Sequence, residues 1–229
     1  MTQHPSVQVE LARRILRIAK DVGIKHAIFS GSLDLLAIPG FDQTSFIAPF
    51  FQAKLDIEKE LQRSGLDFWT ILRPAFFMAN FLPPKVNFQY GNATETGVFP
   101  SGYNADTPIP LVDHQDIAAF AAAAFQNPET FHAKTIDLAG DIIPFGQVLE
   151  LLSSAAGRRL VGKYFSDAEL DQALAEGKPF PKLQACGRGV AQLVDLDQAK
   201  VWGVPLHTFH DFLTREADAV KTTYQSVKA

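Results

Sequence analysis

The five residues Phe68-Trp69-Thr70-Ile71-Leu72 form a nearly unbroken apolar run that ends at Arg73-Pro74. Such a run is typical of a parallel strand that is buried on both faces, with helices covering the sheet. The residues before it, 53–61, carry apolar side chains at helical spacing, and Ser64-Gly65 is a typical helix end. Helix, turn and strand therefore form one unit of a wound parallel sheet. Ligands of such sheets bind beyond the carboxyl ends of the strands, which places the expected site next to Arg73-Pro74.

The rest of the chain alternates helix and strand patterns, so the predicted fold class is α/β. Helices are expected over 7–22, 114–126, 144–157 and 209–224, and strands over 26–30, 110–113, 134–138 and 160–165. Residues 33–49 and 177–203 carry no clear pattern. Residues 82–109 are rich in glycine and proline and are expected to form a long loop, which in compact domains often serves as a binding lid. We expect one domain spanning residues 1–229.

The composition excludes several classes of function. A formal net charge of -4 argues against a nucleic-acid-binding surface, which needs clustered lysine and arginine. No apolar run is long enough to cross a bilayer, so no membrane association is expected. The single cysteine, Cys186, rules out an internal disulfide and is typical of a reducing compartment. We therefore expect a cytoplasmic protein.

Several short motifs around the central strand occur together and in order. They are Lys54-x-x-Ile57-Glu58, Ser64-Gly65-Leu66, Thr70-Ile71-Leu72-Arg73-Pro74 and Phe77-Met78-x-Asn80-Phe81. This series resembles the NmrA-like family, whose members are atypical relatives of the short-chain dehydrogenases and reductases. The resemblance implies the C-terminal portion of a Rossmann-type parallel sheet together with a smaller substrate lobe.

Relative to that family, the first three strands and their helices are missing, so we expect a chain that is truncated at its N-terminus. The G-x-G-x-x-G turn that holds a dinucleotide pyrophosphate is absent as well. In the family's strand order, residues 26–30 would then form an edge of the sheet. An apolar edge strand favours pairing with another chain. We therefore expect either a homo-oligomer through this edge or its coverage by the N-terminal segment or by residues 33–49.

The resemblance implies that Lys54 and Ser30 are catalytic candidates. In short-chain dehydrogenase relatives, a lysine at the place of Lys54 binds the nicotinamide ribose, four residues after a catalytic tyrosine. Phe50 stands at that tyrosine position, so the usual proton donor is missing. Ser30 and Gly31 match the region of the family's catalytic serine. The alternatives are a lysine whose stem lies along a half-buried helix and an ordinary serine–glycine loop.

Residues beyond the central strand are expected to surround the cofactor and a small-molecule substrate. By the same resemblance, the residues that bind NAD or NADP are Ser30, Gly31, Lys54, Pro74, Phe76 and Phe77, and those that form the substrate pocket are Asn80, Phe81, Asp113 and His114. Core packing is the alternative for each aromatic residue among them. A buried amide such as that of Asn80 needs hydrogen-bond partners, which makes it the more informative position.

Asp113, His114 and Asp116 lie close together at the start of a predicted helix. N-capping and the favourable effect of charge at a helix N-terminus explain such residues without a metal. A metal site would need a further converging ligand, and the sequence offers none that can be assigned. We therefore predict no metal site.

Three classes of function follow from these observations. The resemblance implies an NAD(P)-dependent oxidoreductase that acts on a small organic carbonyl or enone. The missing tyrosine keeps open a non-catalytic protein that senses a dinucleotide and binds a protein partner. The missing glycine-rich turn keeps open a cofactor-free pocket used for ligand binding or for a non-redox reaction. Binding of NAD(P)H separates the third class from the first two.

Overall fold

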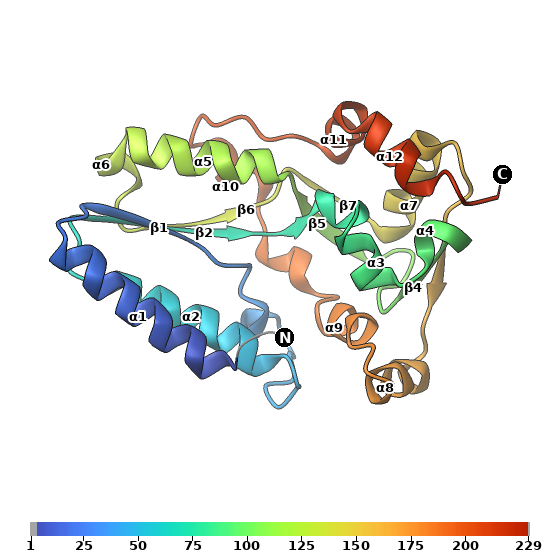
Figure 1. Cartoon of the computed structure of the whole chain (residues 1–229), viewed down its shortest axis with the longest axis horizontal. Helices are drawn as coiled ribbons and strands as arrows, with labels where there is room; N and C mark the ends of the chain where they lie inside the picture. Colours follow the sequence, from blue (N-terminus) through green and yellow to red (C-terminus); the bar gives the residue numbers. More distant parts are fainter. Residues whose placement is uncertain (1–3, 229) are drawn as a thin grey trace.

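A computed structural model describes residues 4–228, so the two ends of the predicted single domain, 1–3 and 229, lie outside the described residues. Figure 1 shows two parts side by side: a small sheet with helices above and below it, and a lobe of short helices and strands that carries the C-terminus. The alternation of strands and helices confirms the α/β class. Within residues 4–228, every helix is too short or too polar to span a membrane.

Three parallel strands form the main sheet, in the order β1-β2-β6. They are β1 (His26–Ser30), β2 (Phe68–Pro74) and β6 (Lys134–Leu138). The central strand β2 buries Ile71 and Leu72 completely, as expected for a strand covered on both faces. Among the described residues β1 pairs only with β2, which confirms the prediction that this strand forms an edge.

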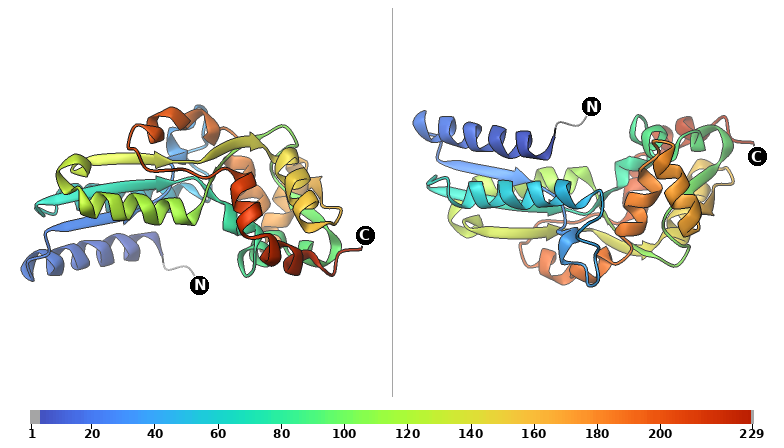
Figure 2. Two further views of the ribbon diagram at one scale, coloured as in Figure 1. Left: turned by 90° about the horizontal axis from the view of Figure 1, so that it is seen from above. Right: turned by 90° about the horizontal axis from the view of Figure 1, so that it is seen from below.

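Helices cover both faces of the main sheet. On one face lie α1 (Pro5–Asp21) and α2 (Ala48–Gln62), and on the other lie α5 (His114–Gln126) and the short α6 (Pro128–Phe131) (Figure 2). α2 packs against the sheet through Ala53 and Leu61, which are buried. Arg13 links α1 to α2, because its Nη2 lies 2.8 Å from Oε1 of Glu60. The α2 helix is therefore held from two sides.

α1 is unusual because it contains no buried residue. Its apolar stripe consists of Val7, Leu11, Ile15, Ile18 and Val22, which are between 47% and 69% exposed. Figure 2 shows α1 at the outer edge of the molecule, next to β1. The edge strand and the helix that carries the exposed apolar residues are therefore neighbours at this edge.

The lobe contains two further small sheets. In one, β5 (Pro108–Val112) lies between β3 (Phe76–Phe77) and β7 (Asp141–Pro144); in the other, β4 (Val98–Ser101) pairs with β8 (Val161–Tyr164). The remaining α-helices are α3 (Lys85–Tyr90), α4 (Ala93–Thr96), α7 (Phe145–Ala156), α8 (Asp167–Ala175), α9 (Phe180–Cys186), α10 (Leu196–Lys200), α11 (Phe209–Arg215) and α12 (Ala217–Tyr224). Short 3₁₀ helices are η1 (Leu35–Ala37), η2 (Met78–Phe81) and η3 (Val190–Leu193).

The glycine- and proline-rich segment 82–109 is not the long loop that the sequence predicts. It forms α3, α4 and β4, separated by turns at Gly91 and Gly97, which both adopt positive φ. Val86, Tyr90 and Phe99 are completely buried. The prediction of a long loop is therefore wrong, because apolar residues of this segment belong to the core.

Two C-terminal segments also differ from expectation. The predicted helix over 209–224 is interrupted at Glu216, where α11 ends and α12 begins. The segment 177–203, which carries no clear pattern, contains α9, η3 and α10. These helices have four to seven residues, which is too short for a reliable helical repeat in the sequence.

Buried aromatic rings hold the lobe together. The ring of Phe81 contacts Tyr90, Phe99 and Phe209 at centroid distances between 5.6 and 6.4 Å. The Tyr224 hydroxyl donates a hydrogen bond of 2.6 Å to the carbonyl oxygen of Phe81. The C-terminal helix is thereby fixed to the segment that directly follows the end of β2.

Candidate active site

A hollow of about 150 Å³ lies at the carboxyl ends of β1 and β2, where the sequence places the site. We call it the sheet-end hollow. Its lining residues are Ser32, Leu33, Leu35, Phe51, Pro74, Ala75, Phe76, Tyr103, Ile109, Pro110, Leu183, Gly187 and Val190. Its volume is below the range of about 300–1,000 Å³ that is typical of ligand pockets, so it accommodates a single ring rather than a large molecule.

Lys54 is not one of the lining residues, but it is linked to two of them. It stands one turn after Phe51 on α2, and its Nζ is 3.4 Å from the carbonyl oxygen of Gly31, the neighbour of Ser32. Burial lowers the pKa of Lys54, while the negative charge of Glu58 acts in the opposite direction. The structure therefore places a partly desolvated ammonium group at the end of the sheet.

The position one turn before Lys54 is occupied by Phe50, in the first turn of α2. Its ring is 38% exposed and has no hydroxyl group. The proton donor of the related dehydrogenases is therefore missing in the structure as well as in the sequence.

Ser30, Gly31 and Ser32 follow one another at the end of β1. Ser30 is exposed and does not line the hollow. Gly31 continues the strand ladder, because its N–H donates to the carbonyl oxygen of Leu72 at 2.8 Å. Ser32 lines the hollow, and its buried Oγ has no hydrogen-bond partner among the described residues. Ser32 is therefore better placed than Ser30 to bind a ligand.

A buried ion pair supports the same end of the sheet. Arg73 at the end of β2 donates two hydrogen bonds to Glu58 of α2, at 2.8 and 2.6 Å. Beside Arg73 in the sheet register lies Asp137 of β6. Burial raises the pKa of Asp137 above its usual value, and the positive charge of Arg73 acts in the opposite direction. Lys54, Glu58, Arg73 and Asp137 thus form a row of side chains with alternating charge, which runs from α2 to β6.

The residues after β2 divide between the hollow and the core. Pro74 and Phe76 line the sheet-end hollow, whereas Phe77 is 37% exposed and does not. Phe81 is only 1% exposed and belongs to the aromatic core, so it is no part of the hollow. Asn80 is half-buried in η2 and also lies outside the lining. For these two residues the structure does not support the predicted substrate pocket.

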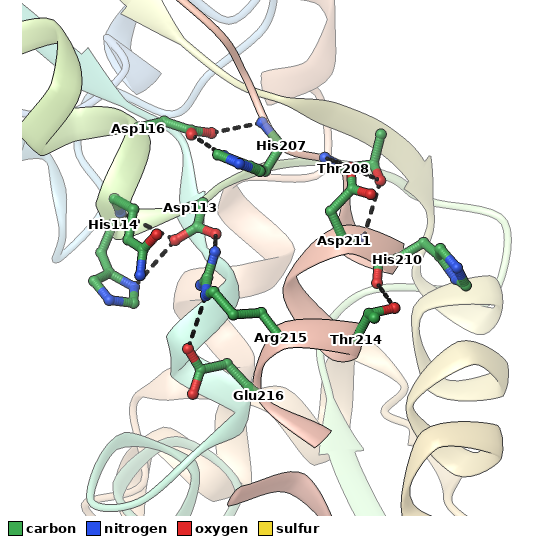
Figure 3. Close-up of polar contacts among 11 residues, drawn as sticks. Asp113, His114, Asp116, His207, Thr208, His210, Asp211, Thr214, Arg215 and Glu216 are labelled. Atoms are coloured by element: carbon green, nitrogen blue, oxygen red, sulfur yellow. Dashed lines mark hydrogen bonds and ion pairs between the residues drawn. The ribbon is translucent and has the colours of Figure 1, made fainter. Parts of the chain in front are cut away.

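Asp113 confirms the N-capping interpretation of the sequence, as its contacts show (Figure 3). Asp113 caps α5 by accepting a hydrogen bond of 3.0 Å from the Gln115 N–H, and its other oxygen lies 2.6 Å from Nη1 of Arg215 in α11. His114 is 3.3 Å from the same carboxylate and is about half-exposed. Both residues lie outside the lining of the sheet-end hollow, because they connect α5 to the C-terminal segment.

Electrostatics explain why Asp113 stays charged. Burial by itself would raise the pKa of Asp113, but the hydrogen bonds from Arg215 and from the Gln115 N–H hold this pKa below its usual value. A second link lies beside it, where Nδ1 of His207 is 2.5 Å from Oδ1 of the buried Asp116. The hydrogen bond to Asp116 raises the pKa of His207. These two pairs fix the C-terminal segment on the start of α5.

The described residues offer no metal site. Within residues 4–228 there is no group of three histidine, cysteine, aspartate or glutamate side chains that could hold a metal ion.

Only the nicotinamide end of a dinucleotide matches the candidate site. A nicotinamide-sized ring matches the sheet-end hollow, with Lys54 and Gly31 beside it. The pyrophosphate of a dinucleotide needs a glycine-rich turn between a strand and a helix N-terminus. In the described part of the chain β1 is followed by η1, β2 by β3 and β6 by β7, so none of the three parallel strands leads into such a turn. The residues present therefore do not supply the phosphate-binding half of a dinucleotide site.

Fold and site together define a class of protein. The structure is a Rossmann-type parallel sheet covered by helices and joined to a smaller lobe. An NADPH-dependent quinone oxidoreductase from Escherichia coli superposes with a TM-score of 0.68 at 22% identity, over 90% of this chain and 72% of its own. At this level of identity the similarity establishes the fold alone.

Residues 1–185 match the model of the NmrA-like family, and the chain belongs to this family. An NmrA-like family domain-containing oxidoreductase of Malbranchea aurantiaca is 25% identical over 66% of this chain and 46% of its own length. An NAD(P)H azoreductase of Xenophilus azovorans is 28% identical over 93% of this chain and 72% of its own. The chain thus spans about half the length of the first of these relatives and less than three quarters of the second.

Sequence reasoning missed several residues of the hollow. Phe51 lies on α2 three residues before Lys54, and this spacing was the available signal. Ser32 belongs to the serine–glycine segment that the sequence singles out, although Ser30 was the residue chosen from it. Leu183, Gly187 and Val190 come from the segment without a clear pattern, and no feature of the sequence brings them to the end of the sheet.

Proposed function

We propose that the protein is an oxidoreductase of the NmrA-like type and that a small organic carbonyl or enone binds in the sheet-end hollow. The observation that carries this proposal is the partly desolvated ammonium of Lys54 beside a ring-sized hollow at the carboxyl ends of two parallel strands. Membership of a family with relatives named oxidoreductase and azoreductase supports the same class of reaction.

In this proposal, the residues at the end of the sheet bind and polarise the substrate. The ammonium of Lys54 stabilises the negative charge that develops on a carbonyl oxygen during reduction, because a partly buried site strengthens such an interaction. The Ser32 hydroxyl, which has no other partner in the described chain, is available to donate to the same oxygen. Phe51, Pro74 and Phe76 exclude water around the reacting carbon.

A nicotinamide dinucleotide, when bound, supplies the hydride in this class of reaction. Because the sheet-end hollow holds a single ring, which this proposal assigns to the substrate, the residues that would contact the ring end of the dinucleotide are Gly31 and Lys54, which do not line the hollow. The described residues contain no pyrophosphate cradle, so we assign no residue to the phosphates.

That missing cradle favours a second candidate function. A chain without a phosphate-binding turn and with Phe50 in place of the proton donor has the properties of a cofactor-free ligand-binding protein. In this case the sheet-end hollow binds a small ring compound, and Lys54 pairs with an acceptor group on it.

Calorimetric titration of the purified chain with NADPH, and then with NADH, decides between the two candidates. Binding at micromolar strength, followed by reduction of a naphthoquinone, is the expected result for the oxidoreductase. Lys54→Ala should weaken this binding about tenfold, because a charge-assisted hydrogen bond is lost. Lys59→Ala is the matched control, since Lys59 lies on the same helix, is about half-exposed and pairs with Asp56.

Absence of dinucleotide binding by a chain with a cooperative unfolding transition would contradict the oxidoreductase. A heat of binding for small ring ketones that disappears in Lys54→Ala would then support the cofactor-free candidate.

A further inference from the structure

Residues of α3, α8 and α9 line a second cavity, which has a volume of about 560 Å³. This volume is within the range that is typical of sites for small organic ligands. The residues that line this cavity are all different from those of the sheet-end hollow. Phe180, at the start of this helix, lines the second cavity, and Leu183, one turn later, lines the sheet-end hollow. The two spaces are therefore separate.

Aromatic rings form much of the wall of the second cavity. Phe88, Phe165 and Phe180 come from three different segments and all face it. The ring of Phe88 is 69% exposed, and its edge meets the ring of Phe180 at a centroid distance of 4.8 Å. Pro100 and Pro181 add further apolar surface. Exposed aromatic rings that gather around a cavity are typical of a surface that binds an apolar partner.

Polar groups occur at a few places on the rim. The side-chain amides of Gln89 and Asn92 line the cavity, and no hydrogen bond to either is found in the described part of the chain. Lys178 also lines it, with its Nζ 2.8 Å from Glu176. Amide and ammonium groups are hydrogen-bond donors, so this rim suits a ligand that carries an acceptor.

Hydrogen bonds and an ion pair within the protein fix the inner wall of this cavity. The buried Gln184 of α9 donates to the hydroxyl of Tyr90 at 3.1 Å and accepts from the N–H of Gly102 at 3.0 Å. Lys182 of α9 pairs with Asp171 of α8 at 2.7 Å. A preformed cavity binds its ligand with a small ordering cost.

We propose that this cavity is a second binding site, which takes a planar aromatic molecule that bears a carbonyl or carboxylate group. The aromatic rings of Phe88, Phe165 and Phe180 contact the faces and edges of the ligand, and the amides of Gln89 and Asn92 donate to its acceptor. The site does not depend on the reaction proposed for the sheet-end hollow, because none of its walls is shared with Lys54 or Ser32.

Titration of the ¹⁵N-labelled full chain with 2-naphthoate, followed by NMR, tests this site. The expected result is a saturable shift of the backbone signals of Gln89, Asn92 and Lys178. Phe88→Ala should weaken binding about tenfold, because an aromatic contact is lost. The ring of Phe88 is exposed, so this variant keeps its fold. Phe125→Ala is the matched control, since Phe125 is 56% exposed on α5 and lies outside both cavities.

Two results would overturn the proposal. One is a titration in which the shifts centre on Ser32 and Phe51, which would place naphthoate in the sheet-end hollow. The other is an affinity that changes in neither Phe88→Ala nor Phe165→Ala. Lys54→Ala should leave naphthoate binding unchanged, which keeps this test independent of the sheet-end hollow.

Discussion

Arg73 of β2 and Glu58 of α2 form a two-pronged ion pair, with Nε and Nη2 at 2.8 and 2.6 Å from the two carboxylate oxygens. The Glu58 side chain is 5% exposed and that of Arg73 is 20% exposed. The hydrogen bonds to Glu58 raise the pKa of Arg73. Because Lys54 stands one turn before Glu58, this pair fixes the rotation of α2 and with it the position of the Lys54 ammonium.

We predict that Glu58→Gln destabilises the protein by about 3 kcal/mol, because it leaves the charge of Arg73 unpaired in a largely buried place. Urea denaturation measures this loss of unfolding free energy. The control is Glu60→Gln, which breaks the more exposed pair with Arg13 and is expected to cost less than about 1 kcal/mol. Equal losses in the two variants would contradict the structural role of Glu58.

The sequence predicts features that depend on residues close together in the chain, and it misses those that depend on residues far apart. The strands β1 and β6 and the helix α5 have the predicted bounds, because their patterns are local and strong. The motifs around the end of β2 are equally local, so the sequence also predicts the position of the ligand site. The pairs Asp113–Arg215 and Asp116–His207 join residues far apart in the chain, and a single sequence carries no signal for them. Periodicity also predicts α1 as a helix without saying whether its apolar stripe has a partner.

The Asp116–His207 pair predicts a pH-dependent stability. The pKa of His207 is raised above its ordinary value of 6.5 in the folded protein, chiefly by the hydrogen bond to Asp116. Its contribution to stability is therefore fully present below about pH 6.5 and is lost as the pH rises through the folded pKa. The difference in unfolding free energy between the native chain and His207→Gln should be larger at pH 6 than at pH 9.

Restoring a hydroxyl in front of Lys54 tests the proposed reaction. Phe50→Tyr places a phenol one helical turn before the Lys54 ammonium, where related enzymes have their proton donor. If the chain reduces carbonyl compounds, this variant should increase kcat by at least about tenfold, since positioned general acids typically contribute more than that. Steady-state kinetics with a naphthoquinone measures the change. Phe46→Tyr is the matched control, because Phe46 has the same exposure of 38% and precedes α2. An equal rate in both variants would count against a proton-transfer role for this position.

The edge strand β1 and the helix α1 lie next to each other at the outer edge of the molecule (Figure 2). The sequence predicts either self-association through this edge or its coverage by the N-terminal segment or by residues 33–49, and we test the first. Half-exposed apolar side chains in a continuous stripe, next to an unpaired strand edge, favour association in water. Light scattering of the native chain should therefore give a mass at least twice that of one copy. Leu11→Asp combined with Ile18→Asp should restore the mass of a single copy, because two charges would enter the contact. Val201→Asp changes an apolar residue that is 80% exposed elsewhere, and it should leave the mass of the assembly unchanged.

A native chain that remains a single copy at concentrations of about 100 µM, where a weak dimer of micromolar Kd would be populated, would contradict the prediction.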